Sequence, residues 1–136
     1  MVSTPAVIER WLRIIESGQT ETGYLTTELE DMLTEDAVFY SPAVFSPQRG
    51  RATTVAYLLA AERMFAGTDF HYVEKWFGDD SAVLQFTADV DGLTVEGIDM
   101  IHWNDEGKIT TVKVMIRPFT ALQGVVGRMA ELLAAG

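Results

Sequence analysis

The sequence predicts an α+β domain in which a curved, mostly antiparallel sheet wraps helices. Two observations favour this class. Apolar residues recur at helical spacing through much of the first 65 residues, whereas alternation typical of strands prevails between residues 70 and 117. Helices and strands that segregate along the chain are typical of α+β proteins. With 136 residues, 48% of them hydrophobic, the chain can bury a sizeable core, so we treat 1–136 as a single domain.

The first helix is predicted to begin at Pro5, because proline suits the first helical position and Thr4 can cap the helix. Apolar residues then repeat at helical spacing as far as Ile15, and Gly18 ends the pattern. A polar connection is expected at Gln19–Gly23.

Three further helices are expected. Thr27 and Glu30 have the spacing of a capping box, which predicts a short helix through Leu33. Another helix is predicted over 54–65, and Pro118 is expected to start a closing helix. The apolar stripe of that closing helix comprises Phe119, Leu122, Val126, Met129 and Leu133. We interpret it as a packing or dimerisation element.

The predicted strands cover 37–41, 70–77, 82–90, 93–103 and a segment that ends near 117. Pro42 stops the first strand, and Pro42–Gly50 is expected to be a loop with very short extended pieces. Asp91 and Gly92 join two alternating segments, which is the sequence of a two-residue hairpin turn with positive φ.

Asp99 is the most informative residue, because it occupies an apolar position of the pattern. Its strand neighbours of the same parity are Leu93, Val95, Gly97, Ile101 and Trp103. A buried carboxylate without partners costs several kcal/mol or more, and its pKa usually rises instead. Such groups cluster at functional sites, so Asp99 is the primary catalytic candidate. The alternative is a structural carboxylate bonded to Trp11, Tyr24 or Tyr40, or one that contacts a partner subunit.

Composition excludes several classes of function. A net charge of −10 argues against nucleic acid or an anionic membrane surface as partner, because both would be repelled. The chain has no cysteine, which excludes disulfides, zinc thiolate sites and thiol nucleophiles. No apolar run approaches the roughly 20 residues that span a bilayer. We therefore expect a soluble, cytoplasmic protein.

Several motifs occur in an order that resembles the nuclear-transport-factor-two-like superfamily, which includes ketosteroid isomerase and the SnoaL-like polyketide cyclases. The motifs are the helix around Trp11, the segment Asp36-Ala-Val-Phe-Tyr-Ser41-Pro42, Gly50-Arg51 at a helix start, Ile98-Asp99 in a strand, and Gly107-Lys108-Ile109. The resemblance covers about residues 5–117. It implies a cone-shaped α+β barrel around an apolar pocket, frequent homodimers, and either enzymatic or purely binding members. It implies no metal and no organic cofactor.

Residue by residue, the resemblance is mixed. Asp99 matches the carboxylic acid that helps to form the isomerase oxyanion hole. Ser41 falls where the isomerase keeps its proton-abstracting Asp, and Trp11 falls where it keeps a hydrogen-bonding Tyr. A serine without an activating partner is no base at neutral pH, so steroid isomerisation by the familiar route is not expected.

The resemblance and the strand pattern together suggest a pocket around Asp99. We expect Trp11 and Phe86 in its wall, and Tyr40 or Ser41 at its opening as a hydrogen-bond donor. Tyr24, in a segment about six residues longer than in the isomerase, could cover the mouth or merely anchor a loop.

Three other polar residues have weaker cases. His102 has the opposite parity to Asp99 and is expected outside the pocket. His71 could reach the pocket as a base but is more often structural in such a setting. Glu74 shares parity with Tyr72 and would be either a second pocket carboxylate or an outer residue. The two histidines make a weak case for a metal site.

The hypothesis is that the protein binds a small, largely apolar, oxygenated molecule, with a protonated Asp99 as general acid of an isomerase-, cyclase- or dehydratase-type reaction. The competing hypotheses are a non-catalytic ligand-binding or dimerisation module and a protein-interaction domain.

Overall fold

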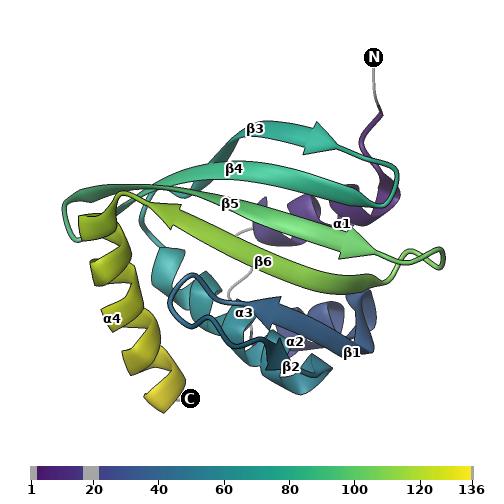
Figure 1. Ribbon diagram of the computed structural model, residues 1–136, viewed down its shortest axis with the longest axis horizontal. Helices are drawn as coiled ribbons and strands as arrows, with labels where there is room; N and C mark the ends of the chain where they lie inside the picture. Colours follow the sequence, from purple (N-terminus) through teal and green to yellow (C-terminus); the bar gives the residue numbers. More distant parts are fainter. Residues whose placement is uncertain (1–2, 17–21, 136) are drawn as a thin grey trace.

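The computed structural model of the protein describes residues 3–16 and 22–135, which form four helices and six strands (Figure 1). The helices are α1 (Ala6–Glu16), α2 (Thr22–Met32), α3 (Arg51–Phe65) and α4 (Phe119–Ala135). The strands are β1 (Leu33–Tyr40), β2 (Gln48–Arg49), β3 (His71–Phe77), β4 (Ser81–Val90), β5 (Leu93–Trp103) and β6 (Ile109–Arg117). None of these helices is long and apolar enough to cross a membrane.

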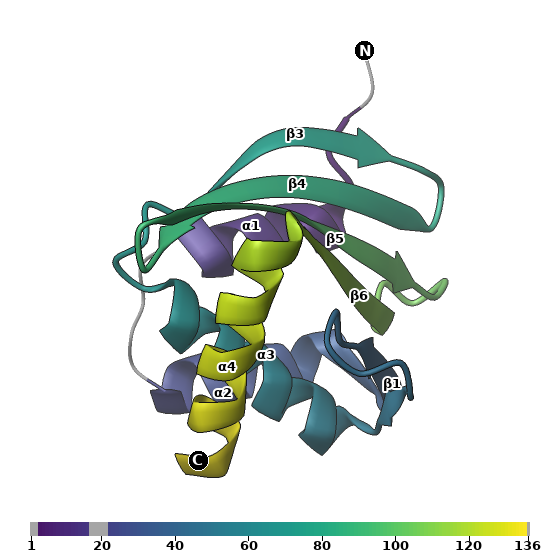
Figure 2. The ribbon, with the colours of Figure 1, turned by 60° about the vertical axis from the view of Figure 1, so that its left-hand side comes forward.

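The strands form one sheet in the order β2-β1-β6-β5-β4-β3. All neighbouring strands are antiparallel except β1 and β6, which are parallel. The sheet curves without closing on itself, and Figure 2 shows it arching around α1 and α3. The predicted α+β class and the curved sheet that wraps helices are confirmed, with one parallel pairing among the antiparallel ones.

The concave face of the sheet carries the core in two parts. The larger part joins α1, α2 and α3 to the sheet, with Ile8, Leu84 and Ile101 fully buried. The smaller part joins α4 to β4 and β5, where Ala121 and Val125 pack near Phe86. In Figure 2, α4 descends from the end of β6 beside α3. Burial of these apolar side chains is the main favourable term in the stability of the fold.

The hairpin of β4 and β5 follows the sequence closely. Their residues pair without interruption from Val90 opposite Leu93 to Ser81 opposite His102. Asp91 and Gly92 have φ values of 51° and 82°, as the two-residue turn requires. The predicted alternation is confirmed, since buried residues alternate with partly buried or exposed ones in both strands.

Two helix starts differ from the prediction. The capping-box interpretation was wrong, because α2 begins at Thr22 and Thr27 lies in its interior. The Thr27 hydroxyl donates to the Gly23 carbonyl 3.0 Å away, which is a hydrogen bond to the preceding turn and not a cap. Helix α3 likewise begins at Arg51, three residues before the predicted start. The predicted end of α1 at Gly18 lies outside the described residues.

The first strand and the last helix also differ in detail. Leu33, expected to end a helix, begins β1, and the strand ends at Tyr40. In α4 the buried residues are Ala121 and Val125, whereas Phe119 is 71% exposed. The buried face of α4 is therefore rotated from the expected apolar stripe towards two smaller residues.

Candidate functional site

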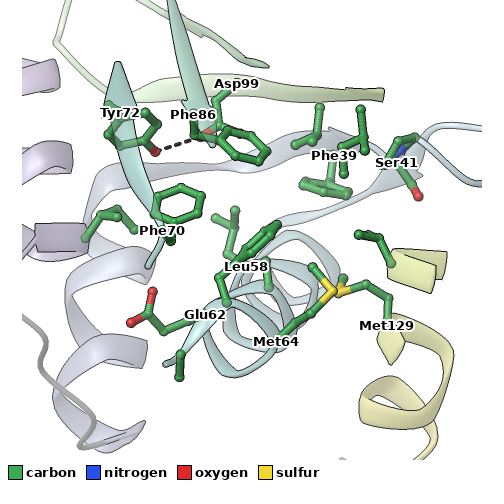
Figure 3. Close-up of a pocket in the computed structure, with 18 of the residues that line it drawn as sticks. Phe39, Ser41, Leu58, Glu62, Met64, Phe70, Tyr72, Phe86, Asp99 and Met129 are labelled. Atoms are coloured by element: carbon green, nitrogen blue, oxygen red, sulfur yellow. Dashed lines mark hydrogen bonds between the residues drawn. The ribbon is translucent and has the colours of Figure 1, made fainter. Parts of the chain in front are cut away.

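A cavity of about 330 Å³ lies between the concave face of the sheet and the helices. Its walls come from all four helices, from β1 and β3 to β6, and from the loops after β1 and α3. Figure 3 shows the side chains that converge on it. The lining is mainly aliphatic and aromatic, as is typical of small-molecule sites. Its polar side chains are those of Trp11, Ser41, Glu62, Asp69, Tyr72 and Asp99.

Asp99 lies in the middle of the sheet, paired with Leu84 on β4 and Val114 on β6. Its side chain faces the cavity and is 8% exposed. The position follows directly from the strand parity noted in the sequence, since β5 is regular on both sides of the residue. The prediction that Asp99 occupies an inward position is thus confirmed.

A chain of hydrogen bonds leads to Asp99 from α1. The indole Nε1 of Trp11 donates to the Tyr72 hydroxyl over 3.0 Å. The same hydroxyl donates to Oδ2 of Asp99 over 2.7 Å, the dashed line in Figure 3. Within the described part of the chain, no donor contacts Oδ1. One carboxylate oxygen is therefore held in place by Tyr72, and the other has no hydrogen-bond donor among the described residues.

Tyr72 reaches Asp99 because of an irregularity in β3. The pairing with β4 shifts between Tyr72 and Glu74, so these two residues do not share a face despite their equal parity. Tyr72 turns inward, whereas Glu74 is exposed. Of the two interpretations of Glu74, the outer one is therefore confirmed. The same irregularity concealed Tyr72, whose role the sequence pattern did not indicate.

The environment of Asp99 raises the pKa of its carboxyl group towards neutral pH. Burial raises the pKa of Asp99 from the ordinary 3.8 to about 6, and the hydrogen bond from Tyr72 opposes part of that rise. Burial and the adjacent carboxylate raise the pKa of Tyr72 well above 10, so Tyr72 remains a donor. The rise for Asp99 agrees with the sequence argument. However, Asp99 is protonated mainly below pH 6 and is mostly ionised at neutral pH.

A cluster of aromatic rings forms one wall of the cavity around Phe86. The ring centroids of Phe65 and Phe70 lie 5.4 Å and 4.9 Å from that of Phe86. Gly97, opposite Phe86 on β5, makes room for this ring. A Cβ at Gly97 would meet the Phe86 ring and would lie 2.8 Å from the Met115 carbonyl oxygen. Glycine at this position therefore sets the shape of the cavity next to Asp99.

Of the residues expected to bind substrate, Trp11, Ser41 and Phe86 line the cavity with Asp99. Tyr40 does not line it, since it lies on the other face of β1 with the Lys113 ammonium 4.8 Å from its ring centroid. The expectation that one of Tyr40 and Ser41 lies at the cavity is thus met by Ser41.

Tyr24 lies away from the cavity. It is 47% exposed, and its hydroxyl donates to Oε1 of Glu28 within α2. Both interpretations of Tyr24 were therefore wrong, because the residue lies within α2, is not among the residues that line the cavity, and bonds to a residue of the same helix.

Neither histidine lines the cavity. His102 is exposed, as its parity predicted, and its Nδ1 lies 3.2 Å from the Thr111 hydroxyl. His71 is also exposed, with Nδ1 2.8 Å from the Asp69 carbonyl. Over residues 3–16 and 22–135 there is no cluster of three or more histidine and acidic side chains placed to hold a metal ion.

Sequence reasoning missed Glu62 and the contribution of α4. In the sequence, Glu62 follows the apolar Leu58 at helical spacing, and this polar residue on an apolar helix face was the available signal. It is half-buried and lines the cavity. Val125 and Met129 bring α4 into the wall. The closing helix, interpreted from the sequence as a packing or dimerisation element, therefore also forms part of the cavity wall.

Comparison with known proteins is consistent with this architecture. A family model described as a SnoaL-like domain matches residues 8–112. A steroid delta-isomerase from Pseudomonas aeruginosa superposes with a TM-score of 0.86 at 31% identity, covering 96% of this chain and 90% of that one. A comparison of the sequence with curated proteins found no match.

Two more distant structures share the fold. A Silicibacter pomeroyi protein with a cystatin-like fold has a TM-score of 0.77 at 23% identity, covering 96% and 84% of the two chains. A protein assigned as a SnoaL-like polyketide cyclase from Jannaschia has a TM-score of 0.69 at 12% identity, covering 92% and 96%. With its family match over most of the chain and its curved sheet around an apolar cavity, the chain belongs to the SnoaL-like domain family of the nuclear-transport-factor-two-like superfamily.

Proposed function

We propose that the cavity binds a small, largely apolar molecule with a carbonyl or hydroxyl oxygen, and that Asp99 exchanges a proton with it. The reaction is an isomerisation, cyclisation or dehydration that uses no metal or organic cofactor. The observation that carries this proposal is a buried carboxylate with one oxygen fixed by Tyr72 and the other unbonded among the described residues, facing an apolar cavity.

The ligand itself makes Asp99 an acid. An apolar molecule that fills the cavity displaces the water that still reaches this carboxylate, and loss of solvation raises its pKa beyond about 6. Asp99 then takes up a proton at neutral pH and donates it from Oδ1 to the ligand oxygen. General acids work best when their pKa lies near the working pH, which this arrangement achieves.

Similarity to the Pseudomonas aeruginosa steroid delta-isomerase supports a search among unsaturated ketones, including steroid ketones. Ser41 stands where the isomerase keeps its base, but a serine hydroxyl is no base at neutral pH. The Ser41 hydroxyl oxygen accepts a hydrogen bond from the Ala43 N–H over 3.0 Å. The residue is therefore proposed to contact the ligand and not to abstract a proton.

A non-catalytic ligand-binding module is the second candidate, favoured by this missing base. A panel of ketones, lactones and unsaturated steroid ketones separates the two functions. Ligand binding appears as a rise in melting temperature, and turnover appears in the chromatogram. In an enzyme, Asp99→Asn abolishes conversion while Asp105→Asn, a change in the exposed β5–β6 turn, does not. Binding without conversion of any compound would favour the module.

We also propose that the protein forms a homodimer. Apolar side chains stand exposed on the strands, with Trp76 at 52% and Met115 at 50% exposure. Light scattering coupled to size-exclusion chromatography at micromolar concentration gives the mass directly. A dimer is expected to have twice the 15.1 kDa mass of the chain, and a monomer mass would refute this proposal.

A further inference from the structure

Glu62 is the second carboxylate of the cavity, and the proton transfer proposed for Asp99 does not use it. It stands on the last turns of α3, and Figure 3 shows it across from Asp99, on the side of the cavity away from Ser41. The cavity thus has polar groups near its middle and at both sides. A ligand that spans it meets Glu62 with a part of the molecule that Asp99 does not contact.

Glu62 has no partner within the described part of the chain. Neither carboxylate oxygen accepts a hydrogen bond there, and the salt bridges among the described residues involve other acidic residues, namely Glu28, Asp31 and Glu96. Burial raises the pKa of this carboxyl. A half-buried carboxylate is stabilised when it gains a hydrogen-bond donor, and a ligand in the cavity is in position to supply one.

The charge of the lining is one-sided. Asp69, Asp99 and Glu62 line the cavity, whereas no lysine, arginine or histidine does so among the described residues. The whole chain, these three carboxylates included, carries a net charge of −10. In a site partly shielded from water, a ligand carboxylate or phosphate would face these charges without compensation.

We infer that Glu62 is a ligand-binding residue that accepts a hydrogen bond from a hydroxyl or protonated amine of the ligand, and that the cavity rejects anionic ligands. This inference rests on the proposed function, because it names the class of molecule that the same cavity binds. The ligand is an apolar body with an oxygen for Asp99 and, away from it, a hydrogen-bond donor for Glu62. Fatty acids and acyl phosphates are excluded.

The test uses three probes with one rigid apolar body: adamantylmethylamine, adamantylmethanol and adamantane carboxylic acid. A cavity of about 150 Å³ can hold benzene, so one of 330 Å³ has room for this body. Calorimetric titration near pH 7.5 is expected to give affinity in the order amine, alcohol, acid. The affinity is expected to fall about tenfold from the amine to the alcohol and again from the alcohol to the acid, since charge-assisted hydrogen bonds are roughly twice as strong as neutral ones. Equal affinity for the acid and the alcohol would overturn the inference without any variant.

Two variants separate the local effect of Glu62 from net charge. Glu62→Gln keeps the shape and removes the charge, and it is expected to lower the preference for amine over alcohol by about tenfold. Glu74→Gln removes the same charge from an exposed position on β3 and is expected to leave the preference unchanged within about twofold. Circular dichroism spectra and melting temperatures of both variants serve as the control for correct folding.

The results also distinguish this inference from the proposed function. If the alcohol binds but Glu62→Gln leaves the preference for the amine intact, Glu62 is not a ligand contact and the cavity function stands. If instead Asp99→Asn alone removes that preference, the amine pairs with Asp99 and the inference is wrong. If none of the probes binds at millimolar concentration, both the inference and the proposed apolar binding site are refuted.

Discussion

Replacing Asp99 with asparagine is expected to stabilise the folded protein at neutral pH, although it removes the proposed catalytic group. The pKa of Asp99 is about 6 in the folded protein against an ordinary 3.8. The folded state holds the proton of Asp99 more tightly than the unfolded state does. The contribution of Asp99 to the free energy of unfolding is therefore greatest below pH 3.8, and it is lost as the pH rises through 6. One pKa unit corresponds to about 1.4 kcal/mol, so the complete loss is about 3 kcal/mol.

The pH dependence is the diagnostic quantity. From the same two pKa values, ionisation of Asp99 lowers the free energy of unfolding by about 3 kcal/mol at pH 7.5 and by about 1 kcal/mol at pH 4.5. Asparagine does not ionise, and its oxygen can still accept from Tyr72. Its amide group adds a desolvation cost that is the same at both pH values. The stability of Asp99→Asn relative to the parent is therefore expected to increase by about 2 kcal/mol between pH 4.5 and 7.5.

Urea unfolding followed by circular dichroism at several pH values measures this difference. Asp105→Asn, in the exposed β5–β6 turn, controls for the change in net charge and is expected to show no such trend. A difference between Asp99→Asn and the parent that stays constant from pH 4.5 to 7.5 would refute the raised pKa, and with it the explanation of how Asp99 becomes an acid.

Three further predictions concern the same site. Tyr72→Phe removes the hydrogen bond that lowers the pKa of Asp99, so carboxyl-carbon NMR is expected to show titration above pH 6; an unchanged or lower pKa would contradict the proposed balance. Binding of a neutral ketone near pH 7.5 is expected to take up close to one proton, measured by calorimetry in buffers of different ionisation enthalpy; no uptake would mean that Asp99 stays ionised in the complex. Gly97→Ala is expected to destabilise the fold by about 1–3 kcal/mol, because its Cβ would lie 2.8 Å from a backbone carbonyl. Its matched control, Gly124→Ala in α4, meets nothing within 4 Å and is expected to stabilise by about 0.5–1 kcal/mol in the same melting experiment.

Sequence alone predicted the sheet and the central residue of the site because β4 and β5 are regular. Each buried position follows from the one before it, so the inward orientation of Phe86 and Asp99 needs no knowledge of the rest of the fold. The turn at Asp91 and Gly92 fixes how the two strands pair.

The remaining site residues depend on tertiary features that periodicity does not contain. Tyr72 faces inward because β3 is irregular after it, and a simple alternation assigns it to the same face as Glu74. The sequence pattern did not show which side of β1 Tyr40 occupies, because this strand has three consecutive buried residues instead of an alternation. Of these three, Phe39 faces the cavity. Glu62 lies in an apolar helical stripe, and only the packed structure shows that this stripe faces a cavity.

The hydrogen-bond chain that begins at Trp11 also gives the protein an optical indicator of the state of its cavity. The Trp11 indole is 3% exposed and reaches the Asp99 carboxylate through a single hydroxyl group. A change in charge at the carboxylate, or the arrival of a ligand, alters the electric field at a buried fluorophore. Trp76, 52% exposed on β3, reports on solvent instead. With Trp103 replaced by phenylalanine, the emission spectrum is expected to contain a signal from the cavity and an internal reference.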